Sequence, residues 1–156
     1  MPTKNITKAA KPFLKWAGGK TQLIGEITKL IPTKFQKEKF TYIEPFVGSG
    51  AVLFWILENF PNLEKAVIND VNGDLINLYQ IIATKAQELI ENLQILQNQF
   101  HKLEKKEEEK KNYYYQKREV YNQRKSSKIK HAALFIFLNR TCFNGLYRVN
   151  KNNEFN

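Results

Sequence analysis

A chain of 156 residues with 42% hydrophobic and 13% aromatic side chains has the composition of a globular protein with a real core. No apolar run approaches the roughly 20 residues that span a bilayer. The basic N-terminus lacks the apolar segment of a secretion signal, so we expect a cytoplasmic protein without a membrane partner. The single cysteine, Cys142, excludes an internal disulfide, and the lack of a Cys/His cluster predicts no metal site.

The net charge of +10 is divided unevenly along the chain. Residues 1–50 carry nine basic and three acidic side chains, and residues 101–156 carry fourteen and six, whereas residues 51–100 carry two and six. Two basic segments therefore flank an acidic middle. Such segments are typical of nucleic-acid binding, although a run of charge is also what a solvated helix face presents.

The first half of the chain alternates helix and strand signals. The expected elements are a helix over 21–31, a strand over 40–43, a helix over 51–57, a strand over 66–69 and a helix over 73–83. Strand, glycine loop, helix and second strand in this order predict a βαβ arrangement, and hence a parallel α/β sheet.

The second half is dominated by helical spacing. The expected helices cover 89–103, 113–125 and 129–138. The last of these is apolar nearly all round, so we expect it to be buried. The mixed-charge run at 102–112 is expected to cap or extend a helix into water. Asn-Gly at 144–145 predicts a β-hairpin around residues 146–149.

The stretch KWAGGKT at residues 15–21 ends like a phosphate-binding loop. A Walker A loop, G-x-x-x-x-G-K-[ST], requires a glycine where Leu14 stands, and Trp16 is bulky where the loop should be open. A nucleotide kinase built on this stretch is therefore a distant alternative. Trp16 and Lys20 need another explanation.

The stretch EPFVGSG at residues 44–50 joins the first strand to a helix. Gly48 and Gly50 remove the Cβ atoms that would keep a ligand away from backbone N–H groups. Asp70 follows at the end of the second strand, where an acid in nucleotide-binding α/β folds accepts hydrogen bonds from both ribose hydroxyls. Its structural alternative is a cap or Asx-turn before the next helix. Loop and acid together favour a ligand that carries adenosine.

The type of adenosine ligand follows from what the loop lacks. The third glycine of G-x-G-x-x-G is replaced by Leu53, which disfavours a pyrophosphate and favours S-adenosylmethionine. Lys20 suits the carboxylate of that cofactor, and Glu44 suits its amino or sulfonium group. Trp16 packs either on the cofactor or in the core.

Four motifs in register resemble those of Dam-type DNA adenine-N6 methyltransferases: KWAGGK at 15–20, EPFVGSG at 44–50, NDVN at 69–72 and NRTCFNGLYRVN at 139–150. The resemblance covers the chain from about Pro12 onward. It implies part of a Rossmann-like S-adenosylmethionine-dependent methyltransferase sheet in residues 1–74. Residues 75–156 would form a helical target-recognition domain that ends in an incomplete β-hairpin.

The resemblance also implies which residues bind. The cofactor residues would be Trp16, Lys20, Glu44, Phe46, Gly48, Gly50 and Asp70. The residues that contact double-stranded DNA would be Lys15, Arg140, Phe143, Asn144, Leu146 and Arg148. For any one of these DNA contacts, a solvated hairpin residue is the structural alternative.

The types of these side chains suit the DNA roles. The two arginines suit phosphates or guanine, because a guanidinium bonds guanine O6 and N7 together. Phe143 and Leu146 suit stacking or wedging beside an opened base step, and Asn144 suits the orphaned partner base.

One family motif is missing from the sequence. The family transfers the methyl group with Asp-Pro-Pro-Tyr, or a close variant, after the recognition segment, and the five prolines here stand at residues 2, 12, 32, 45 and 61. We therefore expect a site-specific adenine methyltransferase, acting at GATC or a GAT-containing site, of which this chain holds the cofactor and recognition parts. Alone the chain is expected to be inactive, as a fragment or as half of a split enzyme whose second chain supplies Asp-Pro-Pro-Tyr. The alternative is a non-catalytic DNA-binding fragment or degenerate methylase.

Overall fold

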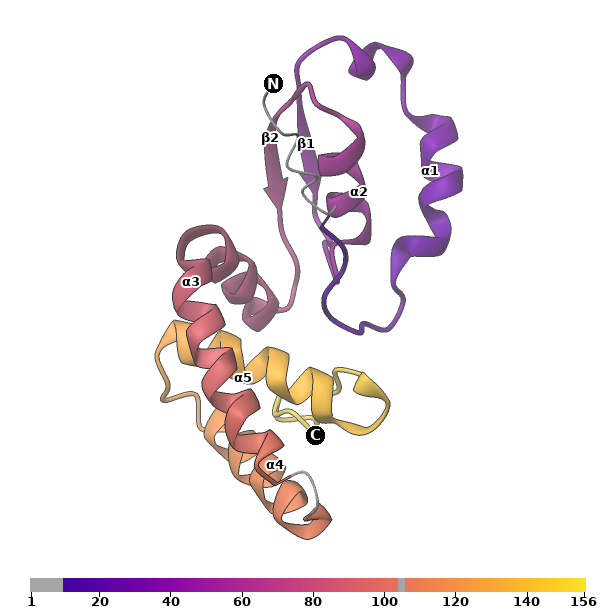
Figure 1. The fold of residues 1–156 in the computed structure, drawn as a ribbon. Helices are drawn as coiled ribbons and strands as arrows, with labels where there is room; N and C mark the ends of the chain where they lie inside the picture. The colour runs from indigo at the N-terminus through magenta and orange to yellow at the C-terminus, as the bar shows by residue number, and fades with distance from the viewer. Residues whose placement is uncertain (1–9, 104–105) are drawn as a thin grey trace. The chain divides into compact units, whose positions relative to one another are not determined.

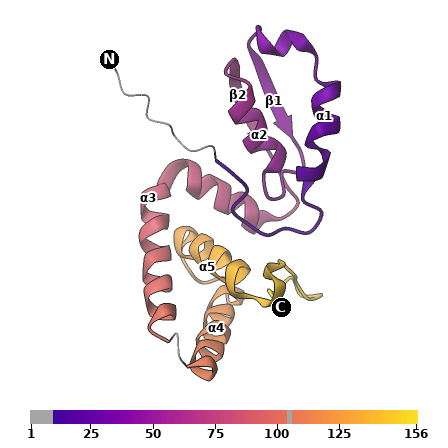
Figure 2. The same cartoon turned by 45° about the vertical axis from the view of Figure 1, so that its right-hand side comes forward.

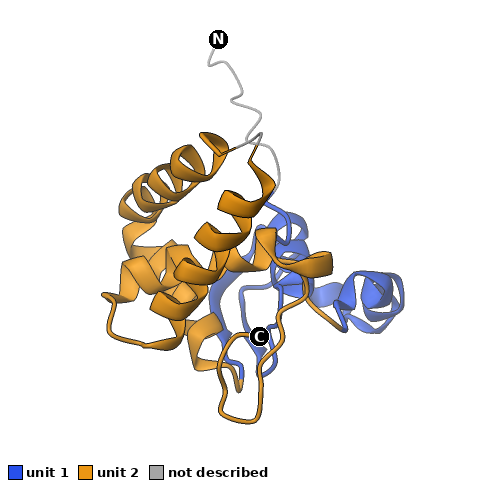
Figure 3. Ribbon diagram, turned by 90° about the horizontal axis from the view of Figure 1, so that it is seen from below, with its two compact units in different colours: residues 1–13, 18–70 blue, residues 14–17, 71–156 orange. Residues whose placement is uncertain are grey.

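The computed structural model describes residues 10–103 and 106–156 (Figure 1). The basic stretch before residue 10 and positions 104–105 of the mixed-charge run lie outside the described residues. The chain divides into two compact units, drawn in two colours in Figure 3. Of the described residues, 10–13 and 18–70 belong to unit 1, and 14–17, 71–103 and 106–156 belong to unit 2.

Unit 1 holds a two-stranded parallel sheet with helices. Its elements are the 3-10 turn Lys20–Leu23, α1 (Ile24–Leu30), the 3-10 turn Thr33–Gln36, β1 (Phe40–Glu44), α2 (Ala51–Asn59) and β2 (Leu63–Ile68). β1 pairs with β2 in parallel, with Ile43 opposite Val67 and Glu44 opposite Ile68. The predicted parallel strand–helix–strand arrangement is confirmed, as part of a mixed helix–strand fold. The predicted first helix begins later than expected, because residues 20–23 form a 3-10 turn.

The core of unit 1 lies between α2 and β1, which run side by side in Figures 1 and 2. Val52, Ile56 and Phe60 are buried, and Phe40 and Tyr42 pack against them from the strand. Side chains alternate between the two faces of a strand, so Ile43 points away from this core and is 64% exposed. The two-stranded sheet therefore has one covered face and one apolar face open to solvent.

Unit 2 is built from three helices: α3 (Gly73–His101), α4 (Glu107–Asn122) and α5 (Lys128–Thr141). α5 packs against both α3 and α4, and its Leu134, Phe135 and Leu138 are almost completely buried. The prediction of a buried, all-round apolar helix is confirmed.

The two helical segments predicted over 73–83 and 89–103 form one helix, α3, with a kink at Lys85 (φ −144°, ψ 39°). Residues 84–88 contain no proline or glycine, so the helix continues through them and is only kinked at Lys85.

The predicted hairpin starts later than the 139–150 motif suggested. Residues 139–141 are the last turn of α5, where Leu138 and Asn139 are fully buried. A short 3-10 turn, Phe143–Gly145, follows, with Asn144 and Gly145 at φ 58° and 65°, values that asparagine and glycine tolerate. Val149 then forms an antiparallel bridge with Phe155, the single bridge outside β1 and β2 that the described residues contain.

Asp74 in the first turn of α3 ties the three helices of unit 2 together. Its carboxylate accepts hydrogen bonds from the Tyr121 hydroxyl at 2.8 Å, from Arg124 at 2.9 and 3.1 Å, and lies 3.1 Å from His131 Nε2. Burial by itself raises the pKa of Asp74, but the hydrogen bonds from His131, Arg124 and Tyr121 outweigh burial and hold the pKa well below its ordinary value of 3.8.

Replacing Asp74 by asparagine is expected to lower the free energy of unfolding by about 2 kcal/mol at pH 7, because Arg124 and His131 lose their charged partner. Since the folded-state pKa lies below the ordinary 3.8, the stabilisation is complete above about pH 5 and is lost progressively as the pH falls through 3.8 and below. Urea unfolding followed by far-ultraviolet circular dichroism at pH 7 and pH 3 checks both points.

Glu108→Gln is the matched control, since Glu108 is an exposed acid in the first turn of α4. Its effect should stay within about 0.5 kcal/mol. Equal loss of stability in the two variants, or an Asp74→Asn effect of the same size at both pH values, would contradict the role given to Asp74.

Candidate cofactor and DNA-binding sites

The loop after β1 is held by an ion pair. Lys20 Nζ lies 2.9 Å from Glu44 Oε1 and also donates a hydrogen bond to the Phe46 carbonyl. Glu44, only 6% exposed, accepts a second hydrogen bond from the Tyr42 hydroxyl at 2.8 Å. Burial, followed by this bond to Glu44, raises the pKa of Tyr42, so the hydroxyl stays a proton donor. The structure thus brings together Lys20, Glu44 and Phe46, three of the predicted cofactor residues.

The loop after β1 is also joined to the end of β2. Asp70 Oδ2 accepts a hydrogen bond from the Gly48 N–H at 2.9 Å, and backbone bonds link Val47 with Asn69. Gly48 (φ 51°) and Gly50 (φ 79°) both take the left-handed conformation that favours glycine. Glu44, the last residue of β1, and Asp70, two residues after β2, therefore lie at the carboxyl ends of two paired parallel strands. This is the edge at which open α/β sheets bind ligands.

The structural alternative for Asp70 as a helix cap is wrong. The residue that caps α3 is Asn72, whose side chain accepts a hydrogen bond from the Leu75 N–H at 3.0 Å. Asp70 instead bonds the glycine loop, so its carboxylate stands at the predicted ligand edge.

Trp16 lies in unit 2, whereas the other predicted cofactor residues lie in unit 1. Its ring stacks on Tyr147 at 5.1 Å and 12°, and contacts Phe135 at 6.3 Å. The sequence leaves two roles open for Trp16, packing on the cofactor or packing in the core. The structure gives it aromatic neighbours and leaves it half-buried, and its cofactor contact stays a prediction.

The predicted DNA residues gather after α5 in unit 2. Phe143 is 85% exposed, and Asn144 and Arg148 are exposed beside it. Leu146 is half-buried, and Arg140 is exposed in the last turn of α5. A large apolar ring this exposed on a polar loop fits a contact surface better than a core position.

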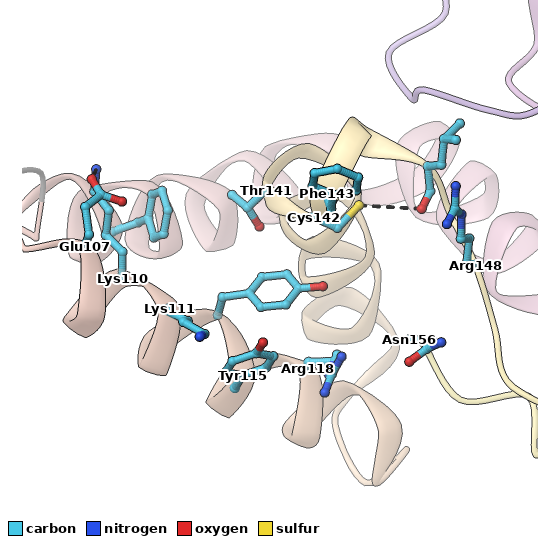
Figure 4. A pocket seen from close by; sticks show the side chains of 13 residues that line it. Glu107, Lys110, Lys111, Tyr115, Arg118, Thr141, Cys142, Phe143, Arg148 and Asn156 are labelled. Carbon is cyan, nitrogen blue, oxygen red and sulfur yellow. Dashed lines mark hydrogen bonds and ion pairs between the residues drawn. The ribbon is translucent and has the colours of Figure 1, made fainter.

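A hollow of about 560 Å³ adjoins this loop, and Figure 4 shows its lining. Phe143, Leu146 and Arg148 line one side of it, and Arg140 does not take part. The lining from α4 is Glu107, Lys110, Lys111, Tyr114, Tyr115 and Arg118. Four basic groups and several aromatic rings therefore face one cavity against a single acid.

The α4 side of the hollow was missed from sequence. The Arg118 guanidinium lies 4.9 Å from the Tyr115 ring centroid and 6.0 Å from that of Tyr114. Lys111, Tyr114 or Tyr115, and Arg118 are spaced by three or four residues, which places them on one helix face. That spacing of basic and aromatic residues, from the end of the mixed-charge run into the helix predicted over 113–125, is the sequence signal for this face.

Cys142 lines the same hollow without being activated. Its Sγ lies 3.6 Å from the Leu146 carbonyl oxygen, the dashed contact in Figure 4. Burial raises the pKa of the Cys142 thiol, so the thiolate that a nucleophile requires is disfavoured. Cys142 is therefore a half-buried packing residue that contacts the main chain of Leu146.

Membrane-spanning helices and metal-binding groups are both lacking from residues 10–103 and 106–156. Within these ranges no helix is both long and apolar enough to cross a membrane. The same residues hold no group of three His, Cys, Asp or Glu side chains arranged for a metal ion.

Comparison with known proteins decides the family. Residues 16–156 match the family model described as D12 class N6 adenine-specific DNA methyltransferase. The chain belongs to this family. The match begins at Trp16 and extends through the whole segment after α5, so it includes all four motifs apart from Lys15.

Relatives of the D12-class chain bear consistent names. It is 46% identical over 149 residues to the type II methyltransferase M.MjaIII of Methanocaldococcus jannaschii, covering 94% of this chain and 50% of that protein. It is 39% identical over 146 residues to a DNA adenine methylase of Haemophilus influenzae, covering 94% of this chain and 46% of that protein. The chain thus spans about half the length of these curated relatives.

Proposed function

We propose that this D12-class chain carries the cofactor-binding and DNA-recognition parts of a site-specific adenine methyltransferase. The enzyme would transfer a methyl group from S-adenosylmethionine to adenine N6 in duplex DNA, at GATC or a GAT-containing site. The observation that carries the proposal is the convergence of Glu44, Asp70 and the glycine loop at the carboxyl ends of β1 and β2.

The donor set of unit 1 fits the cofactor. S-adenosylmethionine supplies an electrophilic methyl group on a positively charged sulfur. Asp70 would accept hydrogen bonds from the ribose hydroxyls, and the buried Glu44 would place negative charge near the amino or sulfonium group. Lys20, already held at this loop by Glu44 and the Phe46 carbonyl, would pair with the cofactor carboxylate.

The loop of unit 1 has features that suit a ligand at its backbone. Phe46 is 63% exposed in the loop, and left-handed Gly48 and Gly50 keep side chains away from the turn. Trp16 is proposed as a cofactor residue on its family resemblance alone.

The DNA would be bound by unit 2. Enzymes that act on a base inside a duplex extrude it from the stack. The exposed Phe143 would wedge into the opened step, Asn144 would meet the orphaned base, and Arg148 would read guanine. Lys110, Lys111 and Arg118 of α4, which line the hollow, would bind the adjoining phosphates. Arg140, outside the hollow, would add a further phosphate contact. The alternative roles as solvated loop residues predict no effect of these side chains on binding.

The transfer step would need groups that this sequence lacks. The adenine N6 amine attacks the sulfonium methyl, and the N6 hydrogens require acceptors during that attack. In the family the Asp-Pro-Pro-Tyr segment provides them, so we propose that a further segment or a second chain completes the enzyme. A non-catalytic DNA-binding role remains the second candidate, favoured by the basic and aromatic hollow.

Binding measurements test the proposal directly. Calorimetry with S-adenosylmethionine and fluorescence anisotropy with a GATC duplex should both show binding by the wild-type chain. Binding of DNA with no binding of S-adenosylmethionine would leave the non-catalytic candidate. Loss of both would overturn the proposal.

Replacing Arg148 by alanine is expected to reduce the preference for GATC over a scrambled duplex by about tenfold, because a guanidinium–guanine pair contributes roughly 1–3 kcal/mol of discrimination. Replacing Lys111 by alanine should instead weaken both duplexes equally and lower the slope of log affinity against log salt by about one. Anisotropy titrations over a series of salt concentrations separate the two effects.

Lys128→Ala serves as the control, because Lys128 is an exposed lysine at the opposite end of α5. This substitution should change neither the preference for GATC nor the slope of log affinity against log salt by more than the experimental error. An Arg148 variant that retains full preference would show that this arginine does not read the site.

A further inference from the structure

Asn139 is a buried polar side chain that the sequence-based assignment did not use. It lies in the last turn of α5 and is 0% exposed. Its Oδ1 accepts a hydrogen bond from the Lys15 N–H at 3.1 Å, and its Nδ2 donates to the Lys15 carbonyl at 2.9 Å. The second Nδ2 hydrogen is directed to the Gly145 carbonyl at 3.1 Å. One amide thus joins three segments of unit 2.

Lys15 depends on this amide for its main-chain pairing. Residues 15 and 16 belong to no helix or strand, so neither has a ladder partner to satisfy its N–H and carbonyl. Asn139 supplies both partners for Lys15 in the way that a neighbouring strand would. Leu14, 5% exposed, and the Trp16–Tyr147 stack hold the segment on either side.

The Lys15 side chain lies along the Phe143–Gly145 turn. A Cβ at Gly145 would collide with Lys15 Cδ and lie 3.2 Å from Lys15 Nζ, so the lysine side chain runs directly across this glycine. Gly145 follows Phe143 and Asn144, the exposed residues of the same turn. The Lys15 ammonium therefore lies at the loop, although 124 residues separate Lys15 from Asn139.

We propose that Asn139 is a positioning residue that fixes the Lys15 main chain and so presents the Lys15 ammonium, beside the Phe143–Gly145 turn, to the DNA site. This inference rests on the proposed function. Ordering a lysine side chain on binding costs roughly 2 kcal/mol in conformational entropy. If the main chain of residues 14–17 were also free, its ordering would add to this cost. The anchor provided by Asn139 avoids that addition. Asn139 acts through Lys15 and does not itself touch DNA.

A double-mutant cycle on DNA binding separates positioning from general stability. The variants are Asn139→Ser, Lys15→Ala and both together, with anisotropy of a GATC duplex as the readout. Each single change is expected to weaken binding about tenfold, and the double variant should bind no more weakly than Lys15→Ala. A purely structural Asn139 would make the two losses multiply, to about a hundredfold, and would overturn the proposal.

Trp16 fluorescence gives a second readout. In a Trp55→Phe background Trp16 is the sole tryptophan, and Asn139→Ser should shift its emission to the red as the 14–17 segment is released. Unchanged emission with unchanged DNA binding would also overturn the proposal. If Asn139→Ser does not fold, Asn139→Asp enters the same cycle, because it retains the acceptor for the Lys15 N–H but lacks both donors.

The outcomes distinguish the two levels of inference. A wild-type chain that binds no DNA overturns the proposed function and this inference with it. A wild-type chain that binds DNA, with multiplying losses in the cycle, overturns only the role of Asn139.

Discussion

Substitution of Asp70 by alanine is expected to lower the affinity for S-adenosylmethionine about a hundredfold. The substitution removes the carboxylate together with its proposed charged hydrogen bonds to the ribose hydroxyls, worth roughly 1.5–3 kcal/mol each. It also removes the hydrogen bond from the Gly48 N–H. Isothermal titration calorimetry at constant pH and salt measures the loss.

Asp70→Asn separates the two contributions of this side chain. The amide carbonyl still accepts a hydrogen bond from the Gly48 N–H, so the glycine loop keeps this bond to residue 70 while the negative charge is removed. We expect an intermediate loss of about tenfold. Glu64→Ala, which removes an exposed acid of β2 paired with Lys39, is the matched control and should change nothing.

DNA binding by the Asp70 variants tests the competing function. Asp70 belongs to unit 1, and the predicted DNA residues belong to unit 2, so duplex affinity should stay within about twofold of wild type. Wild-type affinity for S-adenosylmethionine in Asp70→Ala would remove the basis for the cofactor site. The non-catalytic DNA-binding role would then be the better description.

Methyl transfer by the 156-residue chain alone is expected to fall below detection, a loss of at least about a thousandfold against an intact enzyme. The expected cause is the lack of Asp-Pro-Pro-Tyr, whose acceptors and ring position the adenine amine, and positioning of this kind supplies much of a rate enhancement. Transfer of a tritiated methyl group to a GATC duplex is the measurement.

The controls for this experiment are a full-length relative and a mass spectrum. The DNA adenine methylase of Haemophilus influenzae gives the positive signal, and intact mass under denaturing conditions shows whether the sample holds one species of 18.3 kDa. Methyl transfer by a pure sample of that mass would refute the expectation. Activity that appears only with a second chain carrying Asp-Pro-Pro-Tyr would establish a split enzyme.

The parts of the fold predicted well were those with strong local signals. The nearly all-apolar α5 and the short strands β1 and β2 were predicted because their apolar residues follow one another closely in the sequence, which is a local signal. The family membership replaces the nucleotide-kinase interpretation of GGKT, for which Leu14 already lacked the required glycine. The kink at Lys85 falls in the predicted break between residues 83 and 89, but the continuation of α3 through that break was not predicted.

Local signals were weaker at the segment after α5. Asn-Gly predicted a turn correctly, but the motif that begins at Asn139 was assigned to a hairpin, whereas its first three residues complete a helix. The helix wins there because Leu138 and Asn139 are fully buried in unit 2, a tertiary gain that outweighs local propensity.

By itself the sequence determined the order of elements, the residue types of both predicted sites and the family, because helical and strand periods and short motifs are local properties. Only the tertiary structure decided that Lys20 pairs with Glu44, that Asp70 bonds the glycine loop and that Asn139 holds Lys15. These partners lie between 22 and 124 residues apart. No local pattern encodes such a pairing, since it arises when packed elements bring buried polar groups together and each must find a partner.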